Sequence, residues 1–165
     1  MASLKQVVGY LCKNYPRALE LTETRLTRIV YLADWKSALE RRRPLTSIRW
    51  RFEEGGPSSA EVRDLIRQDL DFEFRVNAGE PLEFVHYKGT PNFTSLEDGD
   101  KQILDFVIDK SATKDWTEFT KLVYSTFPIL TQPRYSLLDL LVLAKEYKNR
   151  DCLLRDAREA CSQAS

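Results

Sequence analysis

The sequence predicts an α+β fold, a mostly helical single domain with a small antiparallel β-sheet or hairpin. Apolar residues recur at helical spacing in several segments, and a short region of alternating polarity lies between them. Because helices both precede and follow this region, a parallel sheet built from β-α-β units is not expected. The 165 residues fit one domain with a sizeable core, and we treat residues 1–165 as that domain.

Two helices are expected before the strands. The first covers residues 4–15, and Pro16 ends or bends it. The second runs from Thr22, which can cap its start, to about Arg42, and Pro44 closes it. Four apolar residues of the second helix share one face and should form core scaffold: Leu26, Ile29, Val30 and Ala33.

Three segments of alternating polarity predict extended structure. Residues 48–53 indicate a short, half-buried strand. Residues 71–76 and 82–87, joined by the turn-rich segment 77–81, predict a β-hairpin that packs on helices. A helix should lie between these regions, from a capping box at residues 58–61 to about Leu70.

The C-terminal third returns to helical patterns. Capping boxes at residues 94–97 and 115–118 predict two helices, and Pro128 should end the second. Ser136 should open a very apolar helix that is central to the core. Residues 151–162 form a weaker terminal helix in this prediction, so a helical extension covers about residues 136–162.

Composition argues against several functional classes. Twenty-five basic and 25 acidic residues give a net charge of zero, whereas nucleic-acid binders usually carry a basic excess. No apolar run is long enough to span a membrane, and the N-terminus lacks the pattern of a signal peptide, so we expect a cytoplasmic protein without a membrane partner. Three scattered cysteines, at positions 12, 152 and 161, indicate free thiols in a reducing compartment.

The sequence shows no recognisable catalytic apparatus, so we expect no enzyme activity. His86 is the one histidine, and it lies on an expected strand without a nucleophile motif nearby. The Gly55-Gly56 pair lacks the spacing of a phosphate-binding loop and indicates a tight turn, although the helix start after it would suit an anion. We expect no metal site and no cofactor.

The densest basic group is interleaved with aromatic residues. It comprises Arg41, Arg42, Arg43, Arg49 and Arg51, with Trp50 and Phe52 between them. Three interpretations remain open: phosphate pairing with base stacking, a protein-binding patch, or a solvated face on which Glu40, Glu53 and Glu54 pair with the arginines.

Five segments resemble the Panacea domain, earlier labelled a SocA-like or phage-associated domain. Residues 26–35, LTRIVYLADW, are similar to its K-L-x-Y-L-A-[DQ]-[YW] helix. Residues 43–46 resemble its G-x-P-[IL] turn, and residues 49–57 its x-W-x-x-G-P-V segment. Residues 96–107 and 119–128 resemble two later helices of the family. The resemblance covers about residues 4–130. Gly55-Gly56-Pro57 replaces the usual aromatic-Gly-Pro, and Tyr124 replaces a histidine.

The resemblance implies an antitoxin, because Panacea domains neutralise toxins in bacterial and phage toxin–antitoxin pairs. It implies direct complex formation with a cognate toxin encoded by a neighbouring gene. One relative is a proteolytic adaptor, so a bacterial protease is a further partner to consider, and an autorepressor that binds DNA is the other alternative.

The expected site residues fall into two groups. The partner-binding group combines the protein-patch interpretation with the resemblance: Trp50, Arg51, Phe52 and Arg49. Alternation along a strand allows only one of the two pairs to face outward, so a buried Trp50 would count against this assignment. The motif residues that the resemblance makes structural are Tyr31, Asp34, Pro44, Gly56 and Pro57.

Overall fold

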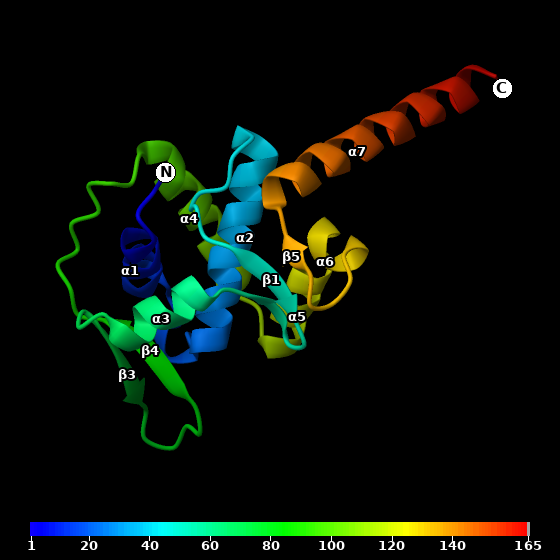
Figure 1. Cartoon of the computed structure of the whole chain (residues 1–165). Coiled ribbons are helices and arrows are strands. Elements are labelled where there is room, and N and C mark those ends of the chain that lie inside the picture. The colour runs from blue at the N-terminus through cyan, green and yellow to red at the C-terminus, as the bar shows by residue number, and fades with distance from the viewer. Residues whose placement is uncertain (165) are drawn as a thin grey trace.

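A computed structural model describes residues 1–164 and shows a helical body with two small antiparallel sheets (Figure 1). It confirms the predicted fold class. The helices are α1 (Leu4–Asn14), the 3₁₀ helix η1 (Ala18–Glu20), α2 (Glu23–Arg41), α3 (Ala60–Gln68), α4 (Asp98–Ala112), α5 (Trp116–Tyr124), α6 (Phe127–Thr131) and α7 (Leu140–Gln163). The strands are β1 (Trp50–Glu53), β2 (Gly56–Ser58), β3 (Phe72–Val76), β4 (Glu83–Tyr87) and β5 (Leu137–Leu138).

Helix α2 is the centre of the fold. Thr22 caps it by accepting a hydrogen bond from the Arg25 N–H, and Arg42 ends it in a left-handed conformation, as the sequence indicates. Most of its residues are buried all around the helix, which is typical of a helix enclosed by other elements. The four predicted scaffold residues, Leu26, Ile29, Val30 and Ala33, are fully buried.

The strands form two separate sheets. In the first, β1 lies between β2 and β5 and pairs antiparallel with both. The second is the hairpin of β3 and β4, with Phe74 opposite Val85 and Val76 opposite Glu83. The hairpin confirms the prediction from residues 71–87, and it projects from the body beside α1 and α3 (Figure 1).

The C-terminal region differs from the prediction. Leu137 and Leu138 form β5, and the helix starts at Leu140 with Asp139 as its cap. Residues 151–162 are part of this same helix, which is continuous to Gln163 and projects from the body (Figure 1). Only its first turns are buried, so α7 is not central to the core. Ion pairs one turn apart, such as Glu146–Arg150, and the lack of a breaker keep it continuous.

Two predicted helix starts and one helix end were misplaced. The cap of α3 is Ser59 rather than Ser58, and α4 begins after Glu97, with a capping box to Asp100. Pro128 does not end α5, which stops at Tyr124; it occupies the first turn of α6, where a missing N–H costs nothing. The capping box at residues 115–118 is confirmed.

We expect the projecting part of α7 to contribute little to the stability of the body. Residues 147–163 are exposed, so a chain that ends at Lys148 should keep its melting temperature within about 2 °C. Leu143→Ala, by contrast, removes a buried side chain at the start of the helix and should cost about 2–4 kcal/mol. Thermal melts followed by circular dichroism compare the two. A loss in the truncated chain as large as that in Leu143→Ala would contradict this assignment.

A candidate protein-binding groove

Strand β1 and the residue before it divide the four expected partner-binding residues into two pairs. Trp50 and Phe52 are buried, at 2% and 6% exposure, whereas Arg49 and Arg51 are exposed. The expectation that the two aromatic side chains lie on a partner surface is therefore wrong, because β1 turns this face toward α2 and α5. Trp50 packs edge-on against Tyr31 and Phe52 against Tyr124.

The exposed arginines are partly engaged within the chain. Arg51 donates hydrogen bonds to the Glu53 carboxylate and to the Tyr135 carbonyl, each with a donor–acceptor distance of 2.9 Å. Arg41 is paired with Asp100 at 2.6 Å, so the basic group does not form one open patch. Glu40 pairs with Lys36 rather than with an arginine. The solvated-face interpretation describes Arg51 and Glu53 best.

Asp34 is the centre of a buried polar network that holds β1 on α2. Its carboxylate accepts hydrogen bonds from the Trp50 indole N–H at 2.7 Å and from the Thr46 hydroxyl at 2.6 Å. The Thr46 backbone N–H donates a third bond at 2.7 Å. Burial raises the pKa of Asp34 to about 6, although these donors oppose the shift. Of the expected structural residues, Tyr31 therefore packs against Trp50, and Asp34 joins β1 to α2 by hydrogen bonds.

The raised pKa of Asp34 predicts a pH-dependent effect of Asp34→Asn. Between about pH 4 and 6 the unfolded chain ionises this carboxyl before the folded chain does, so wild-type stability falls as pH rises. Asparagine does not titrate. The difference in unfolding free energy should therefore shift in favour of Asp34→Asn by about 2 kcal/mol from pH 4 to 7. Urea unfolding of both proteins across this range measures it, and a constant difference would refute it.

Gly56 and Pro57 are buried beside Arg28, which packs this turn onto α2. Gly56 has a φ of 119°, and a Cβ there would lie 3.3 Å from the Arg28 guanidinium, so a side chain is disfavoured twice. Arg28 donates to the Gly55 carbonyl and stacks over the Trp116 ring at 5.0 Å. Pro44 is half-buried in the turn after α2. These motif residues hold the scaffold together.

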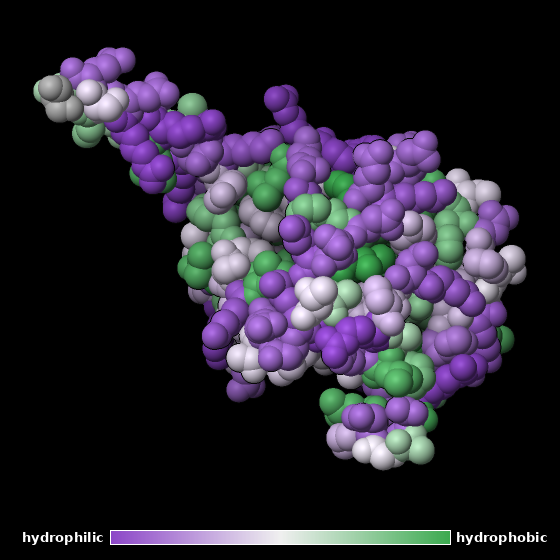
Figure 2. Space-filling model, turned by 180° about the vertical axis from the view of Figure 1, so that it is seen from behind, coloured by the Kyte–Doolittle hydropathy of each residue, from purple (hydrophilic) through white to green (hydrophobic). Residues whose placement is uncertain are grey.

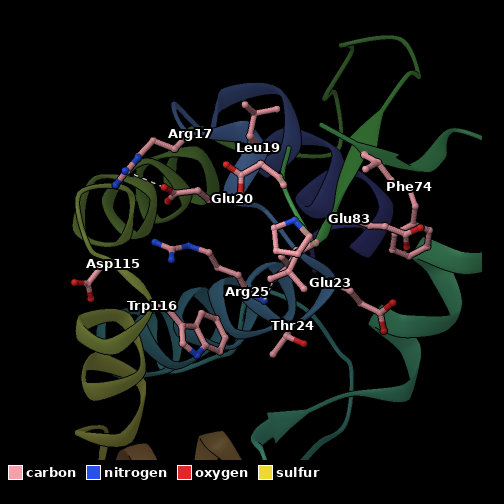
Figure 3. A pocket seen from close by; sticks show the side chains of 15 residues that line it. Arg17, Leu19, Glu20, Glu23, Thr24, Arg25, Phe74, Glu83, Asp115 and Trp116 are labelled. Carbon is pink, nitrogen blue, oxygen red and sulfur yellow. Dashed lines mark hydrogen bonds and ion pairs between the residues drawn. The ribbon is translucent and has the colours of Figure 1, made fainter. Parts of the chain in front are cut away.

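A large open cavity lies elsewhere, between the hairpin and the first turn of α2. It is a groove of about 1030 Å³, bounded by η1, α2, both hairpin strands and the start of α5. In Figure 3, Trp116 and Phe74 lie on opposite sides of the opening, with Glu23 and Arg25 of α2 between them. Its exposed apolar residues, 37% to 67% exposed, are Leu19, Phe74, Val76, Leu82 and Trp116.

Such a concentration of apolar surface is typical of a binding site. Scattered apolar residues are normal on a protein, but a contiguous patch with a polar rim marks an interaction site. From behind, Figure 2 shows hydrophobic residues on the hairpin end of the molecule, whereas the projecting C-terminal helix is mostly hydrophilic. The size and openness of the groove suit a segment of another protein.

The rim of the groove is acidic. Five carboxylates line it, from Glu20, Glu23, Glu80, Glu83 and Asp115. The basic lining residues are Arg17, which pairs with Glu20 at 2.8 Å, and Arg25, which is buried and donates to backbone carbonyls. Among the ion pairs within residues 1–164, Glu23 pairs with Arg67 at 3.1 Å, whereas Glu80 and Glu83 take part in none. The groove therefore favours a partner that carries apolar and basic side chains.

The groove residues are not among the site residues that the sequence predicts. The alternation in residues 71–76 places Phe72, Phe74 and Val76 on one face of β3. The exposed fraction of these side chains rises from 6% at Phe72 to 67% at Val76. The apolar face of the hairpin thus extends beyond the part that the core covers. This apolar alternation was the sequence signal that could have indicated the groove. Leu19 and Trp116 come from distant segments, and their proximity depends on the fold.

The other candidate residues from the sequence are the three cysteines and His86. Cys152 and Cys161 are exposed on α7, and burial raises the pKa of Cys12 to about 12, so that thiol stays protonated. Burial, with the nearby Arg75, lowers the pKa of His86. Within the described chain, no cluster of His, Cys, Asp and Glu side chains is suited to a metal ion. None of the helices in residues 1–164 is both long and apolar enough to cross a membrane.

Comparison with known protein families gives a match. A family model described as "Antitoxin SocA-like, Panacea domain" matches residues 26–127, which is more than half of the chain. The chain belongs to this family of Panacea domains. The match confirms the family that the motifs resemble, over residues 26–127 rather than about 4–130, and it includes the hairpin and Trp116 of the groove. No curated protein and no solved structure matched the chain.

In this Panacea domain, the matched segment begins inside α2 and ends at the first residue of α6. It contains Tyr31, Asp34, Pro44, Gly56 and Pro57, which lie in or beside the core. It also contains about half of the residues that line the groove, whereas η1 and the first turn of α2 precede it. Membership in an antitoxin family indicates an antitoxin-type role and, in general, a toxin as partner.

Proposed function

We propose that this Panacea domain is an antitoxin that neutralises a cognate toxin by direct complex formation, with the groove as the binding site. The observation that carries the proposal is the gathering of five exposed apolar side chains in one acidic groove of an antitoxin-family domain. In this proposal the chain is a binding module in the cytoplasm, without enzyme activity, and its toxin is encoded by the neighbouring gene.

The groove defines the chemistry of the toxin surface. Leu19, Leu82 and Trp116 offer apolar contact area that water leaves on binding, which supplies most of the affinity. The open carboxylates of Glu80 and Glu83 favour lysine or arginine at the edge of the contact, which accelerates association and selects the partner. We therefore expect the toxin to present an apolar segment flanked by basic residues.

Co-expression with the neighbouring gene tests the proposal. The neighbour is expressed alone and together with the Panacea domain, and growth and co-purification are measured. We expect growth arrest by the neighbour alone, and both relief and a stable complex when the two are together. A harmless neighbour, or one that never co-purifies, would contradict the proposal.

Toxin abundance separates direct neutralisation from a proteolytic adaptor. In our proposal the toxin persists in the complex, so its level on an immunoblot stays unchanged while growth recovers. A toxin that disappears in a protease-dependent manner would favour the adaptor. The exposed Arg49 and Arg51 are the observation on which a DNA-binding function would rest. A gel shift that weakens with added salt would support that function instead.

A further inference from the structure

The hairpin has one free backbone edge beside the groove. The outer edge of strand β4 is already occupied. There the Val85 N–H donates a hydrogen bond of 2.9 Å to the carbonyl of Leu21, which follows η1. Strand β3 pairs only with β4 in its sheet. The outer edge of β3 is therefore the place where a further strand can be added.

The register identifies which backbone groups face this edge. Residues opposite each other in an antiparallel pair either exchange hydrogen bonds or both point their N–H and C=O away. Because the Val85 N–H points outward to Leu21, its opposite residue, Phe74, also points outward. The alternation gives Val76 the same direction, while Glu73 and Arg75 bond inward to β4.

Two bonds at the base of the hairpin agree with this alternation. The Phe72 N–H donates to the Asp69 carbonyl at 3.1 Å, outside the ladder. Asp71 and Lys88 are the next opposite pair after Phe72 and Tyr87, so the alternation makes them a hydrogen-bonded pair. The Lys88 N–H accordingly donates to the Asp71 carbonyl at 2.8 Å. Within residues 1–164, no backbone hydrogen bond engages the outward N–H and C=O groups of Phe74 and Val76.

We propose that the toxin binds as an extended segment that adds a third strand to the free edge of β3; this inference rests on the function proposed above. Such a segment satisfies the backbone of Phe74 and Val76 and continues the apolar face that their side chains form. Every second side chain of the segment lies on that face, beside the groove. The same segment carries lysine or arginine, which complements the open carboxylates of Glu80 and Glu83 at the end of the hairpin.

Val76→Pro tests the backbone contact. Proline removes the outward N–H but leaves the bonds between β3 and β4, and proline is tolerated at strand edges. The matched control is Val76→Ala, which also shortens the side chain but keeps the N–H. With the co-purified toxin as probe, we expect Val76→Pro to bind about 10-fold more weakly than Val76→Ala, as the loss of one hydrogen bond implies.

Amide exchange by NMR is a second measurement, and it needs no variant. We expect the Phe74 and Val76 amides of the wild-type chain to exchange rapidly when free and slowly in the toxin complex. Equal binding by the two variants, with rapid exchange in the complex, would overturn the added strand while the antitoxin function stands. Slow exchange in the free chain that depends on its concentration would assign the edge to a second copy. Absence of any toxin complex would refute both proposals.

Discussion

Replacing Leu19 and Leu82 together by serine should abolish growth rescue by this Panacea domain while its fold is retained. Both side chains are more than half exposed at the groove, so serine leaves the core intact. Each leucine loses apolar area that the toxin would otherwise cover, and together they should cost about 3 kcal/mol of binding, or about 100-fold in Kd. Growth of cells that co-express toxin and variant is the measurement.

The chain offers a matched control for this experiment. Leu130 and Leu153 are 69% and 68% exposed, and they lie away from the groove on α6 and α7. The double replacement of these two by serine changes the overall hydrophobicity equally and should leave rescue at the wild-type level. Equal rescue by both double variants would show that the groove is not the toxin site.

Asp34→Ala should lower the unfolding free energy by about 2–4 kcal/mol at pH 7. The change leaves the Trp50 indole N–H and two donors of Thr46 buried without an acceptor, and each such group costs about 1–3 kcal/mol. Relief of the buried carboxylate, whose pKa is about 6, offsets part of this loss. Urea unfolding of the free protein measures the effect.

Asp64→Ala is the control for Asp34→Ala, since Asp64 is an exposed aspartate on α3. We expect it to change stability by less than about 0.5 kcal/mol. If Asp34→Ala were equally mild, the network around Asp34 would not be what holds β1 on α2. Trp50 and Asp34 would then need another explanation for their burial.

Local signals in the sequence were enough for most elements. Helix α2, the hairpin and the capping box at residues 115–118 follow from spacing, turn residues and caps, which act within a few residues. The capping boxes at 58–61 and 94–97 were misplaced because several neighbouring polar residues can cap, and packing decides between them. Pro128 was misjudged because proline suits both the end of one helix and the first turn of the next.

Which face of a strand or helix is buried could not be predicted from the sequence. Alternation in residues 48–53 separates Trp50 from Arg51, but the hydrogen bond from Trp50 to Asp34 decides which side is buried. Aromatic residues beside arginines occur in interfaces and in cores alike. For α7, an apolar start indicated the core, yet only Leu140, Leu143 and Ala144 have neighbours to bury them. The groove joins segments far apart in the chain, so the apolar alternation of β3 marks one side of it and no local pattern marks the whole.

Hydrogen–deuterium exchange of the toxin complex against the free Panacea domain tests the central claim most directly. We expect slower exchange in residues 17–25, residues 74–83 and the start of α5, which together enclose the groove. We expect unchanged exchange in the projecting part of α7 and around Arg49 and Arg51. Slower exchange confined to those two regions, with the groove unaffected, would contradict the account.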